Sequence, residues 1–360
     1  MGPLHADDLR GRVQTALDVH LAHQRDVLAE LGPDVDDLVT AVATLLRGGK
    51  RLRAAFLYWG YRAAGRPDSD ALVRCASAME LFQAAALIHD DVMDDSDTRR
   101  GQPAAHRTLA RLHEDRAWDG DADRFGLAGA ILAGNLCLNW TEETYATCGL
   151  PAEDLTRGRP TFDRMRTQLM AGQFLDVVES HRPWGALRPE ERADRARLVI
   201  AYKSAKYTVE HPLLIGASAG GLGPAALGPL SAYGFDLGQA FQLRDDILGV
   251  FGDPEVTGKP AGDDLRERKR TVLVAHTLTA LGRPEAEHVM DLIGRPDLTE
   301  EEVGQLRGLM KRTGAVDRVE AEITDLAESA RTSLHAATGL TPEAARALDE
   351  LVDTATTRSF

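Results

Sequence analysis

The sequence of 360 residues predicts an all-α fold. Apolar residues recur at intervals of three and four along most of the chain, as at Val42, Leu45 and Leu46, and this is the spacing of one buried helix face. Sustained alternation of apolar and polar residues, which would indicate strands, is absent from the sequence. Helix-start signals such as Thr299-x-x-Glu302, a capping box, support the same fold class.

In chain order, the pattern predicts helices at residues 36–63, 71–95, 126–148, 158–181, 190–220, 227–250, 270–281, 299–312, 314–337 and 341–357. Stretches rich in Gly, Pro, Asp and Arg are predicted to be loops, at residues 96–125, 182–189 and 251–268. Because no stretch reads as a flexible linker and no internal repeat is present, residues 1–360 are expected to form a single domain.

The net charge of −14 argues against a nucleic-acid partner and against binding to anionic membranes, so a phosphate site would have to be a local basic patch. The sequence has no uninterrupted apolar run of about 20 residues and no signal peptide pattern. Cys75, Cys137 and Cys148 lack the spacing of a zinc site or a disulfide framework. We therefore expect reduced, mostly buried cysteines, no transmembrane segment and a cytoplasmic protein.

Five of the eight residues from 90 to 97 are aspartates, directly after an apolar helical run. On a helix, Asp90 and Asp94 lie one turn apart on the same face, so their mutual repulsion requires a cation or extensive solvent between them. Carboxylates are hard oxygen ligands that suit Mg²⁺. The alternative is a solvated helix end, although negative charge is unfavourable at a helix C-terminus.

Two groups of basic residues favour a phosphate partner. Arg99 and Arg100 follow the acidic run, and a guanidinium group can bind two phosphate oxygens at once. Lys50, Arg51 and Arg53 place three cations within four residues, which suits a diphosphate better than a nucleic acid. The alternative for the arginine pair is a surface loop of salt bridges.

A second acidic pair, Asp245 and Asp246, closes another apolar helix, and its alternative is again a solvated helix end. The chain has six lysines against 36 arginines. Four of these lysines lie in segments where other features already suggest a phosphate site, namely Lys50, Lys203, Lys259 and Lys269.

Six segments between about residues 45 and 275 together resemble the motifs of the trans-isoprenyl diphosphate synthases, or polyprenyl synthetases, in order and spacing: GGKRLR, DDVMDDSDTRRGQPAAH, GQFLD, YKSA, FQLRDD and TGKPAGDDLRERK. The segment DDILGVFGD looks most like the geranylgeranyl diphosphate synthases of actinobacteria. The resemblance implies the helical bundle of the isoprenoid synthases, with a central active-site cavity in one domain, and a homodimer.

The implied reaction joins isopentenyl diphosphate head to tail to an allylic diphosphate (dimethylallyl, geranyl or farnesyl), with three Mg²⁺ ions when substrate is bound. Breaking the allylic C–O bond leaves a carbocation and a diphosphate, so catalysis consists mainly of stabilising negative charge. In this family the departing diphosphate is expected to accept the proton. His89 and His106 therefore need not act as bases and are expected to have structural or supporting roles.

The resemblance also implies residue roles. The residues expected to bind metal are Asp90, Asp91, Asp94, Asp245 and Asp246. Those expected to bind the allylic diphosphate are Arg99, Lys203 and Lys259, and these three with the five aspartates form the expected catalytic set. Those expected to bind isopentenyl diphosphate are Lys50, Arg53, Gln83 and Arg100. The other expected substrate-binding residues are Gln173, Asp176, Ser204, Phe241, Gln242 and Lys269.

Four positions depart from the family pattern. Gly249 stands where a third aspartate is frequent, and Ser204 stands where threonine is usual. Arg268 stands where bacterial members commonly have glycine, and Asn135 where many have aspartate. These departures affect the expected affinity for metal and substrate more than the reaction type.

Product length is expected to depend on the helix below Asp90. Ala85 and Ala86 are small where makers of fifteen-carbon products carry an aromatic residue, so the pocket should stay open at that level. Phe82 would lie about 12 Å below Asp90 at 1.5 Å per residue and could form the floor. This predicts a twenty-carbon product, with ordinary core packing as the alternative role of Phe82.

Two other functions are alternatives to the synthase. A class I terpene cyclase would carry an Asn-x-x-x-Ser-x-x-x-Glu type of motif, which is absent after Asn135 and Asn139. A regulatory subunit of a heteromeric prenyl synthase would be expected to lack the aspartate motifs, and this chain keeps the first one intact.

Overall fold

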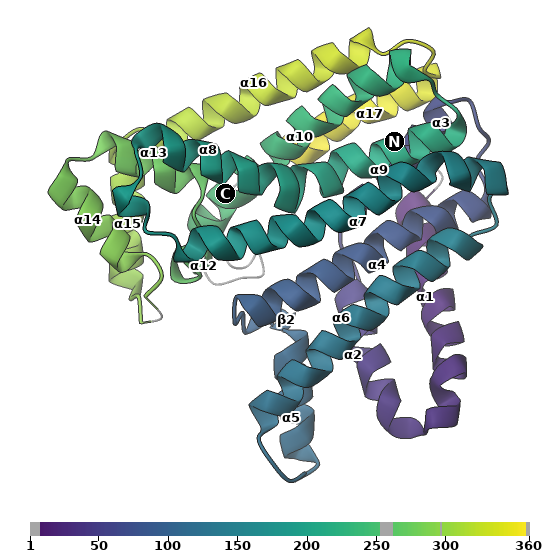
Figure 1. Cartoon of the computed structure of the whole chain (residues 1–360), viewed down its shortest axis with the longest axis horizontal. Helices are drawn as coiled ribbons and strands as arrows, with labels where there is room; N and C mark the ends of the chain where they lie inside the picture. The colour runs from purple at the N-terminus through teal and green to yellow at the C-terminus, as the bar shows by residue number, and fades with distance from the viewer. Residues whose placement is uncertain (1–7, 253–261, 296, 358–360) are drawn as a thin grey trace. The chain divides into compact units, whose positions relative to one another are not determined.

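The structure, a computed structural model, describes residues 8–252, 262–295 and 297–357. Figure 1 shows that these residues form helices joined mostly by short connections, and their strands are confined to one two-stranded hairpin. The predicted all-α fold is therefore confirmed. The chain divides into two compact units: unit 1 comprises Met1–Arg159, Pro212–Leu222 and Gly339–Ala347, and unit 2 comprises Pro160–His211, Gly223–Thr338 and Leu348–Phe360.

Unit 1 contains the N-terminal helices and the hairpin. Its elements are α1 (Leu9–Leu28), η2 (Ala29–Leu31), η3 (Pro33–Val35), α2 (Asp36–Leu46), α3 (Leu52–Ala63), α4 (Asp70–Met93), β1 (Thr98–Arg99), β2 (Gln102–Pro103), α5 (Ala105–Asp115) and α6 (Ala122–Thr147). The first turns of α7 (Ala152–His181), nearly all of α9 (His211–Gly220) and the start of α17 (Pro342–Thr356) also belong to it.

Helix α4 forms the centre of unit 1 and packs against α6, α3 and α1. Its N-terminus is capped by Ser69, whose Oγ accepts the backbone N–H of Leu72 at 3.1 Å. By length and composition α4 could span a membrane, but 78% of its most apolar window is buried inside the protein. Such burial is what a core helix requires, because an apolar side chain gains stability only where it leaves water.

Unit 2 contains the remaining helices. These are most of α7, η4 (Trp184–Ala186), α8 (Pro189–Val199), η5 (Ile200–Glu210), α10 (Pro224–Phe251), α12 (Asp263–Arg266), α13 (Val272–Ala280), α14 (Arg283–Leu292), α15 (Glu300–Arg312), α16 (Ala315–Ala336) and the end of α17. The apolar core of this unit lies where α10 packs against α16 and η5, and α13 packs against α8 and α16.

Two predicted helices are divided in the structure. The stretch 36–63 forms α2 and α3, because Gly48 and Gly49 between them have φ values of 75° and 87°. This left-handed conformation ends a right-handed helix and favours glycine. The stretch 190–220 forms α8, η5 and α9 in direct succession, and η5 is a π-helix.

Four helices and a hairpin were not predicted. Helix α1 buries one apolar residue in each turn, namely Leu9, Val13, Leu17 and Leu21. The other positions of this segment are mostly polar, so its apolar periodicity is weak. Helix α5, the hairpin and the short helix α12 fall in stretches predicted to be loops, and α14 follows a predicted helix end. The shorter of these elements depend on packing against their neighbours more than on local sequence preference.

Candidate active site

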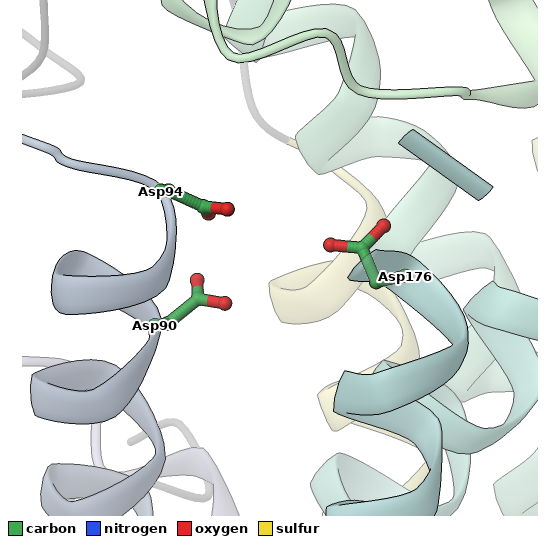
Figure 2. Close-up of side chains that lie close together, drawn as sticks. All are labelled: Asp90, Asp94 and Asp176. Carbon is green, nitrogen blue, oxygen red and sulfur yellow. The ribbon is translucent and has the colours of Figure 1, made fainter. Parts of the chain in front are cut away.

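The first acidic cluster lies at the C-terminal end of α4 in unit 1. Asp94 is the capping residue, and its backbone N–H donates to the carbonyl oxygen of Asp90 at 2.8 Å. One carboxylate oxygen of each residue lies within 4.8 Å of the other. Figure 2 shows both side chains on the same side of α4. Two carboxylates held this close together fit a hard divalent cation such as Mg²⁺.

Asp91, between them in sequence, is turned inward and is only 1% exposed. The Nε of Arg99 donates to Asp91 Oδ1 at 2.7 Å, and its Nη2 makes a second, short contact with the same oxygen. The same Nη2 lies 4.0 Å from Asp90 Oδ2. Asp91 thus fixes a guanidinium group beside the half-buried carboxylate of Asp90.

The hairpin of β1 and β2 carries the two neighbouring arginines. Arg99 pairs with Gln102 across the hairpin, and Arg100 and Gly101 form its tip with φ values of 55° and 73°. Two successive positive φ values are typical of the type I′ turn that tight hairpins use. The Arg100 side chain turns back, and its Nη1 donates to the Leu45 carbonyl oxygen at 2.9 Å.

The GGKRLR segment gathers more positive charge near Arg100. A Cβ atom placed on Gly49 would lie 3.3 Å from Arg100 Nη1, so this guanidinium packs closely on the loop. Lys50 is exposed, whereas Arg53 in the first turn of α3 is 8% exposed. Arg100 is exposed as a whole residue, but packing on the loop removes water from its guanidinium group, and this is the main cause that lowers its pKa. The charge of Glu80 opposes this shift, and the charges of Arg51, Arg53 and Arg99 add to it.

Unit 2 holds a second group of charges, on α7, on η5 and in the segment between α12 and α13. The Nζ of Lys203 lies 2.5 Å from Asp176 Oδ2, and the Nζ of Lys269 lies 3.4 Å from the same oxygen. Lys269 also lies 3.7 Å from Glu267 Oε2. One carboxylate therefore brings together two of the lysines that the sequence singled out. Figure 2 labels Asp176 on α7.

A hydrogen-bonded chain of three side chains links η5 to the second acidic pair. Ser204 Oγ donates to Gln242 Oε1 through a short contact, and Gln242 Nε2 donates to Asp246 Oδ1 at 2.7 Å. Asp246 is 6% exposed, and burial first, then the carboxylates of Asp264, Asp245 and Asp176, raise its pKa well above the usual range of an aspartate. Such an excess of negative charge is the environment that a divalent cation would relieve.

The other predicted site residues have less distinctive surroundings. Asp245 is exposed, Phe241 and Gln83 are half-buried, and Lys259 lies outside the described residues. Gln173 is 7% exposed, and its side-chain Oε1 is buried without a hydrogen-bond partner among the described residues. A buried carbonyl without a partner is unfavourable by about 1–3 kcal/mol, so it suits a place where a ligand or water binds.

The two histidines near the first cluster differ in their surroundings. His89 Nε2 lies 3.3 Å from the Ile131 carbonyl oxygen, and a Cβ atom on Gly134 would lie 2.3 Å from this nitrogen. His106 is 2% exposed, and both of its ring nitrogens are buried without a hydrogen-bond partner among the described residues.

The proposed chain-length residues all lie in the interior of unit 1. Phe82 is 1% exposed, Ala85 0% and Ala86 4%.

Sequence reasoning missed two carboxylates. Glu80 is 3% exposed on α4 and pairs with Arg51, and Asp264 on α12 lies against Gly249. A glutamate in the middle of an otherwise apolar helix was the available signal for Glu80, because charged residues are rarely fully buried unless paired. Asp264 belongs to the segment TGKPAGDDLRERK, so the resemblance of that segment to a family motif was the available signal for it.

The chain is similar in sequence and in structure to a family of known enzymes. The sequence model of the family described as polyprenyl synthetase matches residues 36–310. A geranylfarnesyl diphosphate synthase of Aeropyrum pernix is 31% identical over 310 residues, covering 85% of this chain and 89% of that protein. A geranylgeranyl diphosphate synthase of Mycobacterium tuberculosis is 31% identical over 292 residues, covering 79% and 76%.

Among solved structures, a geranylgeranyl pyrophosphate synthase from Corynebacterium glutamicum, complexed with isoprenyl diphosphate and magnesium, is 38% identical with a TM-score of 0.92 and covers 98% of this chain and 99% of its own. The family match covers well over half of the chain. The chain therefore belongs to the polyprenyl synthetase family and is a trans-prenyltransferase, which condenses isopentenyl diphosphate with allylic diphosphates.

Proposed function

We propose that this prenyltransferase makes geranylgeranyl diphosphate, a twenty-carbon product, from isopentenyl diphosphate and a shorter allylic diphosphate (dimethylallyl, geranyl or farnesyl). The relatives from M. tuberculosis and C. glutamicum carry the name of this product, whereas the A. pernix relative is named for geranylfarnesyl diphosphate. The observation that carries the site assignment is the pair of Asp90 and Asp94 carboxylates beside an Arg99 guanidinium that Asp91 holds in place.

The metal ligands are proposed to be Asp90, Asp94, Asp245 and Asp246, with Asp91 as a supporting residue and three Mg²⁺ ions when substrate is bound. Bound Mg²⁺ would neutralise charge on the diphosphate as it leaves. The carboxylate donors fit this ion, because the oxygens of Asp90 and Asp94 are close together and Asp246 lies among other carboxylates.

The allylic diphosphate is proposed to bind Arg99, Lys203 and Lys259, with Lys269 nearby. Arg99 is held by Asp91, and Lys203 and Lys269 are held by Asp176. Cations that are fixed before substrate arrives stabilise developing negative charge without reorganisation, and this is the main source of catalysis in a reaction of this type.

Isopentenyl diphosphate is proposed to bind Lys50, Arg53, Arg100 and Gln83. The reacting ends of the substrates are proposed to meet Gln173, Asp176, Ser204, Phe241 and Gln242. The buried side-chain oxygen of Gln173 and the hydrogen-bonded chain from Ser204 to Asp246 support this part of the proposal.

Phe82 is proposed to limit product length. Its side chain is large and buried, and the positions three and four residues nearer to Asp90 are alanines. Phe82→Ala is therefore expected to lengthen the product by at least one five-carbon unit. Products of unchanged length, sized by mass spectrometry, would assign Phe82 to ordinary core packing.

The test of the whole proposal is incubation with Mg²⁺, isopentenyl diphosphate and, in turn, the five-, ten- and fifteen-carbon allylic diphosphates, with products sized by mass spectrometry. We expect a twenty-carbon diphosphate. Release of a cyclic hydrocarbon would indicate a terpene cyclase, and failure to extend any primer would indicate a regulatory subunit.

A matched pair of variants tests the acidic cluster. Asp94→Asn should reduce turnover by about a hundredfold or more, as expected when charge stabilisation of a transition state is lost. Asp97→Asn is the control, because Asp97 belongs to the same acidic run but pairs with Arg107 Nε at 2.7 Å and is exposed. Its activity should stay within about twofold of the original.

We also propose that the enzyme is a cytoplasmic homodimer. Helix α6 has exposed apolar side chains at Ile131 (43%) and Leu132 (55%), which a second subunit could cover. Cys75, Cys137 and Cys148 are buried and free of disulfides, as expected in a reducing compartment.

A further inference from the structure

Glu80 is a buried carboxylate that the proposed reaction does not use directly. It lies on α4, ten residues before Asp90 and three residues before Gln83, and it is 3% exposed. A buried charge is strongly unfavourable unless it is paired and hydrogen-bonded. Glu80 meets this requirement in two ways, because Arg51 Nη1 lies 3.2 Å from its Oε2 and the backbone N–H of Ala54 donates to its Oε1 at 3.2 Å.

The bond to Ala54 fixes the start of α3. The first N–H groups of a helix have no partner inside the helix and need an acceptor from elsewhere. Arg51, the residue before α3, has no side-chain acceptor to offer. Glu80 supplies the acceptor from α4, and so it orients the first turn of α3, which carries Arg53.

The bond to Arg51 fixes the loop that carries Lys50. The Arg51 guanidinium pairs with Glu80 on one side, and on the other it donates to the Leu46 carbonyl oxygen through a short contact and to Gln14 Oε1 at 2.5 Å. Arg51 itself has a left-handed φ of 56°, a conformation that persists only when surrounding contacts hold it. Glu80 and Arg51 therefore join α4 to the end of α2 around this loop.

Glu80 also counterbalances the positive charge in this part of unit 1. Arg51, Arg53 and Arg99 act on Arg100 as like charges, and the Glu80 carboxylate is the anion that raises the pKa of Arg100 against them. Arg100 is bonded to Leu45, next to the Leu46 carbonyl that Arg51 binds. The two arginines thus anchor on adjacent carbonyl groups at the end of α2.

We propose that Glu80 is a positioning residue for the binding of isopentenyl diphosphate. Glu80 acts through Arg51 and the first turn of α3, and in this way it positions Lys50, Arg53 and Arg100. This proposal rests on the assignment of those three cations to isopentenyl diphosphate. The positioning role and simple electrostatics predict opposite changes in the affinity for isopentenyl diphosphate when Glu80 loses its charge. Removing a negative charge near an anion site should strengthen anion binding, whereas losing a positioning residue should weaken it.

Glu80→Gln is the direct test, because glutamine keeps the size and can still accept from Ala54 but no longer pairs with Arg51. The KM for isopentenyl diphosphate should rise about tenfold, in line with the loss of a charge-assisted bond. The KM for the allylic diphosphate should stay within about twofold. Arg51→Met should have a similar effect, and the double variant should be no worse than either single variant, because residues that act as one unit are not additive.

Asp154→Asn is the matched control for loss of a buried carboxylate in unit 1. Asp154 is 0% exposed, accepts from the Tyr61 hydroxyl at 2.6 Å and pairs with Arg157. Its replacement should lower the melting temperature and leave both KM values unchanged. If Glu80→Gln is too unstable to purify, Arg51→Met provides the same comparison of the two KM values, because it removes the ion pair from the other side.

Two results would overturn the positioning role. One is an unchanged or lower KM for isopentenyl diphosphate in Glu80→Gln; the other is an equal rise of both KM values together with a loss of thermal stability. The proposed function is tested separately by Lys50→Ala and Arg53→Ala. If those variants left the KM for isopentenyl diphosphate unchanged, the assignment of the substrate site would fail whatever Glu80→Gln does.

Discussion

Gly249 leaves room for a carboxylate that comes from another helix. A Cβ atom placed on Gly249 in α10 would lie 1.9 Å from Asp264 Oδ2 and 2.4 Å from its Cγ. No side chain fits at position 249 while Asp264 keeps this conformation. The Asp264 carboxylate thus occupies the space into which a third aspartate on α10 would project, and this gives the departure at Gly249 a physical reason.

The first prediction concerns this pair. Gly249→Asp should lower the free energy of unfolding by about 1–3 kcal/mol, the usual effect of overpacking, with repulsion between two carboxylates added. Combining it with Asp264→Gly removes the clash and should restore most of the melting temperature. Thermal unfolding of both variants without substrate measures this, and a single variant as stable as the original chain would contradict the predicted clash.

The second prediction concerns Arg268, which has a left-handed φ of 58°. This conformation is unfavourable by about 1–2 kcal/mol for a residue with a Cβ atom. The Arg268 side chain offsets part of that strain, because its Nη2 donates to the Gly294 carbonyl oxygen at 3.3 Å. Both Arg268→Gly and Arg268→Ala lose this bond, but only glycine relieves the strain.

Arg268→Gly should therefore be more stable than Arg268→Ala by about 1 kcal/mol in chemical denaturation. A glycine variant that is less stable than the alanine variant would show that the backbone at this position is not strained.

At the scale of single residues, the sequence identified candidate site residues better than it identified their hydrogen-bond and ion-pair partners. The acidic runs and the scarce lysines could be selected from the sequence because burying or crowding charge requires compensation. It could not reveal that Asp91 holds Arg99 or that Asp176 lies beside both Lys203 and Lys269. Such pairs depend on which helices pack together, and a single sequence does not specify that.

At the scale of elements, long helices with broad apolar faces were predicted well, and α4, α6, α10, α15 and α16 lie close to their expected ranges. Helices with a narrow buried face were missed. Helix α14 is only 10 residues long and buries only Val289 and Leu292, so it offers few positions from which a helical period can be recognised. The change from α-helix to π-helix in η5 was also unpredictable, since it alters hydrogen bonding without a marked change in composition.

The third prediction concerns how closely η5 packs against α7. A Cβ atom on Gly172 would lie 2.4 Å from the carbonyl carbon of Tyr202 and 2.7 Å from the backbone nitrogen of Lys203. Gly172→Ala should therefore push η5 away and lower stability by about 1–3 kcal/mol. Because η5 carries Lys203, kcat/KM for the allylic diphosphate should fall more than the KM for isopentenyl diphosphate rises.

Gly228→Ala is the control for this prediction. Gly228 also lies in a helix, α10, but no atom lies within 4 Å of a Cβ atom placed there. This variant should gain about 0.5–1 kcal/mol, because alanine favours a helix over glycine. Equal effects of the two substitutions would mean that close packing at Gly172 does not matter.

At the scale of the whole molecule, the proposed site residues are divided between two units. Unit 1 carries the acidic end of α4 and the arginine cluster, while unit 2 carries the lysine pair with Asp176 and the Asp246 cluster. The order of the motifs along the chain predicted the family correctly, but a single-domain organisation stays a prediction. Each unit has buried apolar residues of its own, and several motif residues of each unit have hydrogen-bond partners within it.

The last prediction concerns the homodimer. Leu132, exposed on α6, should be buried when a second copy covers that helix, and a charge placed there would be desolvated in both subunits at a free-energy cost of several kcal/mol. Leu132→Glu should therefore convert a species of twice the chain mass into one of the single-chain mass, as measured by analytical ultracentrifugation.

Leu198→Glu is the control, because Leu198 is 45% exposed on α8 in unit 2. If both variants sediment as the original chain does, α6 is not the interface, and if the original chain is itself a monomer, the homodimer proposal fails.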